Sequence, residues 1–126
     1  MAISFYVHIP FCRRKCHYCD FNSYAGLEHL FQPYIEALSR EISLLAQISE
    51  PEAGESLYLG GGTPSLLPPE LVGIVVESLK EKFGLLPEAE ITLEANPGTV
   101  GKSSLETFLK VGINRLSLGA QSFHQD

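Results

Sequence analysis

Short apolar runs alternate with segments of helical period along this chain, and this alternation constrains the fold more than any other feature. Four runs rich in β-branched and aromatic side chains predict strands at residues 3–9, 56–59, 91–95 and 115–120. Three stretches between them carry apolar residues at helical spacing, at about residues 30–45, 68–83 and 103–111. This order predicts an α/β fold with four parallel strands, three helices and right-handed crossovers.

Proline and glycine mark where the three helices begin and end. Pro33 is expected in the first turn of the first helix, where its missing N–H group costs little. Pro69 opens the second helix in the same way, and Gly84 and Gly112 are expected to end the second and third helices.

The predicted elements make only part of a closed barrel. A (β/α) barrel usually takes about 250 residues, whereas this chain has 126. We therefore expect residues 1–126 to be the N-terminal part of one larger barrel domain, with the remaining elements and any C-terminal domain absent.

The composition excludes several functional classes. A net charge of −6 argues against a general nucleic-acid binder, which usually has a basic face. No run reaches the ~20 apolar residues of a membrane helix, and no leading segment has the layout of a signal peptide. We therefore expect no integral membrane segment and a cytoplasmic location, where thiols stay reduced.

All three cysteines lie within one short segment after the first predicted strand. Cys12, Cys16 and Cys19 have the spacing C-x3-C-x2-C, and clustered thiols in a reducing compartment more often bind metal than form disulfides. Thiolates suit zinc, with His8 or His17 as a fourth ligand, and they equally suit an iron–sulfur cluster with one iron left open. The residues alone leave both possibilities open.

Functional groups of parallel α/β sheets gather beyond the carboxyl ends of the strands. That rule selects the cysteine segment and three others, at residues 60–64, 94–98 and 119–123. The glycine run at 60–62 lacks the signature of a phosphate-binding P-loop. Bare glycine does let a ligand approach the backbone closely. The four segments together predict one shared site.

The cysteine spacing, with Tyr18 just before the last cysteine, resembles the radical S-adenosylmethionine (radical SAM) superfamily. The resemblance implies a partial (β/α)6 TIM barrel and a 4Fe-4S cluster on Cys12, Cys16 and Cys19. It also implies that S-adenosylmethionine chelates the fourth iron. An electron from the cluster then cleaves the sulfonium and gives a 5′-deoxyadenosyl radical.

The resemblance also implies which residues contact the nucleotide cofactor. Gly61, Gly62 and Thr63 correspond to the segment that binds the amino group of S-adenosylmethionine. Glu94 could pair with a ligand ammonium or with ribose hydroxyls, or it could be a capping or salt-bridging surface acid. Gln121 is expected to hydrogen-bond the nucleoside. The aromatic residues expected near the cluster and the adenine are Tyr6 and Tyr18.

Four segments in the same order look like the oxygen-independent coproporphyrinogen III oxidase-like branch of this superfamily: YVHIPFCRRKCHYCDF, YLGGGTPSLL, ITLEANPGT and RLSLGAQSF. The coproporphyrinogen dehydrogenase subgroup has a further cysteine where this chain has Phe21, and an N-terminal extension before the first strand. Both differences favour the haem chaperone subgroup, whose members bind haem and deliver it to target proteins.

The first functional hypothesis is therefore a haem chaperone, and the alternative is an enzyme that oxidatively decarboxylates porphyrinogen propionates. The implied partners are haem or a porphyrin, a flavodoxin-type electron donor and a haem-accepting target protein. Arg13, Arg14 and Lys15 form either a solvated loop tip or a group of positive charges that offsets a negative cluster or meets an acidic electron donor.

Overall fold

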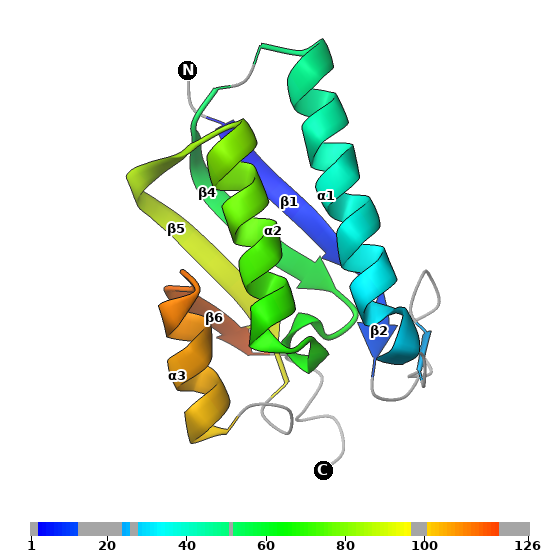
Figure 1. The fold of residues 1–126 in the computed structure, drawn as a ribbon. Helices are drawn as coiled ribbons and strands as arrows, with labels where there is room; N and C mark the ends of the chain where they lie inside the picture. Colours follow the sequence, from blue (N-terminus) through cyan, green and yellow to red (C-terminus); the bar gives the residue numbers. More distant parts are fainter. Residues whose placement is uncertain (1–2, 13–23, 26–27, 51, 97–100, 119–126) are drawn as a thin grey trace.

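The computed structural model describes residues 3–12, 24–25, 28–50, 52–96 and 101–118 (Figure 1). The strands within these ranges are β1 (Ile3–Ile9), β2 (Phe11–Cys12), β3 (Tyr24–Ala25), β4 (Gly54–Gly61), β5 (Leu85–Ala95) and β6 (Arg115–Leu118). The three helices are α1 (Phe31–Ile48), α2 (Pro69–Lys82) and α3 (Lys102–Lys110), with short 3-10 turns at Glu28–Leu30 and Pro64–Leu66.

The main sheet is parallel throughout and has the strand order β1-β4-β5-β6. This confirms the prediction of an α/β fold with four parallel strands and three helices. One row of the sheet runs from Tyr6 through Tyr58 and Thr92 to Arg115. The strands β2 and β3 form a separate two-stranded sheet that the sequence did not predict, since two residues are too few to show a period.

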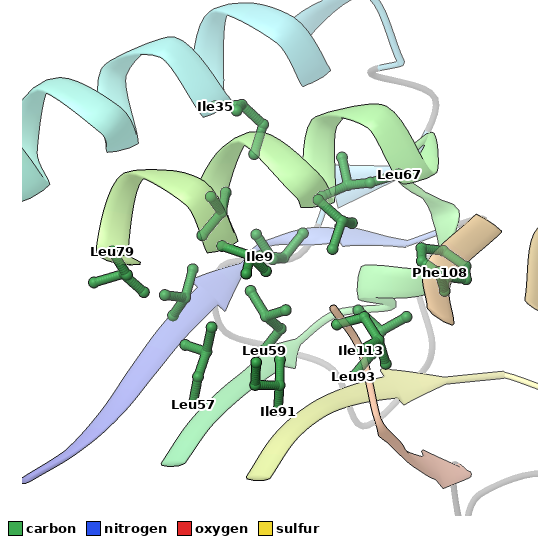
Figure 2. Close-up of a cluster of buried hydrophobic side chains, with 14 of the residues drawn as sticks. Ile9, Ile35, Leu57, Leu59, Leu67, Leu79, Ile91, Leu93, Phe108 and Ile113 are labelled. Carbon is green, nitrogen blue, oxygen red and sulfur yellow. The ribbon is translucent and has the colours of Figure 1, made fainter. Parts of the chain in front are cut away.

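The hydrophobic core lies between one face of the sheet and the three helices (Figure 2). Alternate strand residues such as Ile9, Leu59 and Leu93 are fully buried there. The helices contribute Ile35 from α1 and Phe108 from α3, and several side chains from α2: Val72, Val75, Val76 and Leu79.

The opposite face of the sheet carries polar and aromatic residues at the intervening positions. On β4, for example, Ser56, Tyr58 and Gly60 alternate with the buried Leu57 and Leu59. Because side chains alternate across a strand, this face looks away from the helices. The candidate site is built on it.

The predicted helix ends are confirmed. Pro33 lies in the first turn of α1, and Pro69 is the first residue of α2. Gly84 and Gly112 follow α2 and α3 with φ angles of 95° and 115°, in the left-handed region that glycine adopts most readily. Among the helices of the described ranges, none combines the length and the apolar character needed to cross a bilayer.

Candidate functional site

The candidate site lies at the carboxyl edge of the sheet, where β1 and β4 lead into the segments that follow them. The Gly62 N–H donates to the Ile9 carbonyl at 2.7 Å, and the Thr63 N–H donates to the Phe11 carbonyl at 2.6 Å. These two bonds join the glycine segment to the chain that enters the cysteine segment. Cys12 follows Phe11 directly in β2, so two of the four predicted site segments begin side by side.

Glu94 connects β5 to the same place. Its Oε1 accepts a hydrogen bond from the Gly61 N–H at 3.0 Å, and its Oε2 accepts one from the Tyr58 hydroxyl at 2.8 Å. Among the described residues, Glu94 has no cationic partner and caps no helix. Its carboxylate is directed at the glycine segment.

Gly60 and Gly61 are required by the packing of the site itself. A Cβ atom on Gly60 would lie 2.8 Å from Tyr58 Cε1, 3.1 Å from Tyr6 Cε1 and 3.1 Å from Glu94 Oε1. Gly61 has a φ angle of 119°, and its Cβ would lie 2.7 Å from the Ile9 carbonyl oxygen. Any side chain at either position would displace the groups that surround this edge.

Two tyrosines form an aromatic surface beside the carboxylate. The rings of Tyr6 and Tyr58 stack with their centroids 6.0 Å apart and an interplanar angle of 16°. Tyr6 is 59% exposed, so much of its surface is open to a ligand. The Tyr6 hydroxyl lies 3.4 Å from His8 Nδ1. Helix α1 fixes this end of β1, because the Tyr34 hydroxyl donates to the His8 carbonyl at 2.6 Å.

The phenols of this cluster stay protonated over a wider pH range than free tyrosine. Partial burial, followed by the charges of Glu94 and Tyr58, raises the pKa of Tyr6. A hydrogen bond with Ser117 lowers the pKa of Tyr58, but partial burial and Glu94 outweigh it and leave the pKa raised. Tyr58 is therefore a hydrogen-bond donor to Glu94 at neutral pH.

The structure brings together five of the predicted cofactor-binding residues at one edge: Tyr6, Gly61, Gly62, Thr63 and Glu94. Tyr18, Gln121, Cys16 and Cys19 lie outside the described residues, and Cys12 is described only through its backbone. No group of three potential metal ligands occurs among the side chains that are described, so the cysteine prediction remains a prediction.

Sequence reasoning missed Tyr58 as a member of this site. The signal was present in the period of two along β4, which puts Ser56, Tyr58 and Gly60 on one face. As a short apolar run, residues 56–59 give no reason to separate Tyr58 from its leucine neighbours.

The residues at this edge suit a small ligand with an aromatic part and a cationic part. Glu94 supplies a negative charge, Tyr6 supplies an exposed ring, and the glycine segment leaves backbone free of side chains. The donor set of the adjoining segment, three thiols at short spacing, suits a soft metal centre. These features fit a 4Fe-4S cluster with S-adenosylmethionine beside it.

Comparisons with known proteins identify relatives along almost the whole of this chain. The Radical SAM superfamily profile matches residues 6–126. A zebrafish protein (Danio rerio), "Radical S-adenosyl methionine domain-containing protein 1, mitochondrial", is 39% identical over 123 residues, which are 98% of this chain and 28% of that protein. The Heme chaperone HemW of Escherichia coli is 36% identical over 125 residues, which are 98% of this chain and 33% of that protein.

A solved structure has the same fold. It is the coproporphyrinogen III oxidase HemN of Escherichia coli, described as a radical SAM enzyme. It matches with a TM-score of 0.87 at 34% sequence identity, over 97% of this chain and 28% of that chain. The chain thus spans about a third or less of the length of the relatives it matches.

Proposed function

Because this chain belongs to the radical SAM superfamily, we propose that it binds a 4Fe-4S cluster through Cys12, Cys16 and Cys19 and S-adenosylmethionine beside it. Residues 1–126 then form the N-terminal part of a radical SAM core domain. The observation that carries this proposal is the pair of backbone bonds from Gly62 and Thr63 to the chain entering the cysteine segment. When bound, such a cluster supplies an electron for the cleavage of S-adenosylmethionine.

The chain's own residues have distinct roles in this proposal. The segment Gly61–Thr63 offers backbone groups to the amino group of the cofactor, and Glu94 pairs with its ammonium or ribose hydroxyls. Tyr6 and Tyr18 pack near the cluster and the adenine, and Gln121 hydrogen-bonds the nucleoside. Support comes from the position of Glu94, whose two oxygens accept bonds from Gly61 and Tyr58 at this edge.

We further propose that the complete protein is a haem chaperone, which binds haem and transfers it to a target protein. Support comes from several bacterial relatives named Heme chaperone HemW, with identities of 36–40%. The sequence also has Phe21 where the dehydrogenase subgroup has a further cysteine. A flavodoxin-type reductant, a haem-accepting protein and a cytoplasmic location complete this proposal.

The second candidate is an oxygen-independent coproporphyrinogen III dehydrogenase. The likeness to the HemN structure, at a TM-score of 0.87, favours it. Haem binding and porphyrinogen turnover, measured on the complete gene product, separate the two. Stable haem binding without turnover supports the chaperone, whereas turnover without stable haem binding contradicts it.

Cluster binding is tested by replacing the cysteines one at a time. After anaerobic reconstitution with iron and sulfide, the Cys12→Ala, Cys16→Ala and Cys19→Ala variants should each lose most of the bound iron. Wild-type protein should retain about four irons per chain, the number in one cluster of this type. Full iron content in any of the three variants would contradict the proposed ligand set, as would stoichiometric zinc in the wild type.

A further inference from the structure

We propose that Tyr58 is a positioning residue for the cofactor site, which acts through Glu94 on the glycine segment. The inference rests on the proposed function, because it assigns a role within the same site. It starts from a continuous set of hydrogen bonds on the polar face of the sheet. The Tyr58 hydroxyl donates to Glu94 Oε2, and Glu94 Oε1 accepts from the Gly61 N–H.

The contacts of Tyr58 reach across three strands. Tyr58 lies on β4, whereas its hydrogen-bond partner Glu94 lies on β5 and its stacking partner Tyr6 lies on β1. Tyr58 therefore holds the end of β5 against the segment that follows its own strand.

This hydrogen bond restricts the orientation of the carboxylate. A carboxylate has about four lone-pair positions, and donors to both oxygens hold its plane in one rotamer. Hydrogen bonds to charged groups are also stronger than neutral ones. Tyr58 and Gly61 donate to the two oxygens of Glu94 and set the orientation of its carboxylate. The remaining lone pairs can accept hydrogen bonds from a ligand.

The close packing around Gly60 leaves little room for Tyr58 and Glu94 to adopt other positions. The rings of Tyr6 and Tyr58 and the Glu94 carboxylate all close over the Cα atom of Gly60. Tyr58 is only partly buried and is not a member of the hydrophobic core. Its ring contributes a stack with Tyr6, and its hydroxyl group contributes the bond that orients Glu94.

The test is the Tyr58→Phe variant, which keeps the ring stack and removes the hydroxyl. The matched control is Ser56→Ala. It removes another hydroxyl from the same face of β4, where the Ser56 hydroxyl donates to Ser4 Oγ at 2.8 Å, away from the site. The first measurement is hydrogen exchange of the Gly61 amide in cluster-free protein. We expect exchange about five- to tenfold faster in Tyr58→Phe and unchanged in Ser56→Ala, because a hydrogen bond to a charged group is being weakened.

The second measurement is S-adenosylmethionine affinity of the reconstituted protein, by equilibrium dialysis. Tyr58→Phe should bind about five- to tenfold more weakly, with the same iron content as wild type. In a Glu94→Gln background the same change should have little further effect, because residues that act through one another are not additive. If Tyr58 had a purely structural role, Tyr58→Phe would lower the affinity for S-adenosylmethionine equally in the wild-type and Glu94→Gln backgrounds.

The outcomes separate the inference from the proposed function. Unchanged Gly61 exchange in Tyr58→Phe overturns the positioning role whether or not a cluster forms. Equal losses of affinity in the two backgrounds also overturn it. Faster Gly61 exchange in a protein that binds no S-adenosylmethionine supports the positioning contact and contradicts the proposed function instead.

Discussion

Replacing Gly60 by alanine should disrupt the packing of the site. The added Cβ would lie 2.8 Å from a ring carbon of Tyr58 and 3.1 Å from both a Tyr6 ring carbon and Glu94 Oε1. The Tyr58 ring is stacked on Tyr6 and hydrogen-bonded to Glu94, so it cannot move without breaking one of these contacts.

The magnitude follows from two alternative losses and one gain that opposes them. Overpacking typically costs about 1–3 kcal/mol. Relief of the clash by moving the carboxylate instead gives up a hydrogen bond to a charged group, which is worth about 1.5–3 kcal/mol. Only one of these losses applies at a time, and replacing glycine in a strand returns about 0.5–1 kcal/mol. The net loss in the free energy of unfolding should be about 1.5 kcal/mol.

Urea unfolding followed by circular dichroism measures this change. The matched control is Gly101→Ala at the start of α3, where a Cβ would meet nothing within 4 Å. Gly101 is extended, with a φ angle of −119°, and bonds Ser104 through backbone atoms that alanine retains. The control should change stability by less than about 1 kcal/mol, as an uncrowded surface change does. A Gly60→Ala variant as stable as wild type, or no less stable than the control, would refute the packing described around Gly60.

Two further predictions concern the core and the pH dependence of stability. Phe108→Ala should lower the free energy of unfolding by about 3–5 kcal/mol, because this side chain is 1% exposed. Leu109→Ala, at a 64% exposed position one residue later, should lower it far less. Equal losses of stability in urea unfolding would contradict the assignment of the buried face of α3. Ser117 and Arg115 lower the pKa of Tyr58, but partial burial and Glu94 together leave it raised. The raised pKa contributes stability that is present below the unfolded pKa, near 10.0, and is lost as pH rises through the folded pKa. The difference in stability between wild type and Tyr58→Phe should therefore shrink above about pH 10, and a difference that grows with pH would contradict this sign.

The sequence predicted the architecture well because its signals are local. Strands rich in Leu, Ile and Val alternate with helices that begin at Pro69 and end before Gly84 or Gly112, and each signal acts through the backbone of a few residues. The common edge of the strands followed from the parallel order alone, which is why Gly61 and Glu94 could be expected at one site.

The contacts within the site were not predictable in the same way. The bond between Tyr58 and Glu94 joins residues 36 positions apart, and it depends on the register of β4 against β5. A shift of one residue would turn Tyr58 into the core. The need for glycine at position 60 likewise comes from Tyr6 on a different strand. The sequence suggested that the glycine run lets a ligand approach, whereas the structure shows that Gly60 is needed for the packing of neighbouring side chains.

The central claim is that the cysteine segment and the carboxyl edge of the sheet form one site for a cluster and S-adenosylmethionine. It is tested most directly by reconstituting the protein anaerobically with iron and sulfide, reducing it, and recording EPR spectra with and without S-adenosylmethionine. We expect the signal of a reduced 4Fe-4S cluster that changes when S-adenosylmethionine is added. A cluster signal that is indifferent to the nucleotide, or bound zinc with no cluster, would contradict the account.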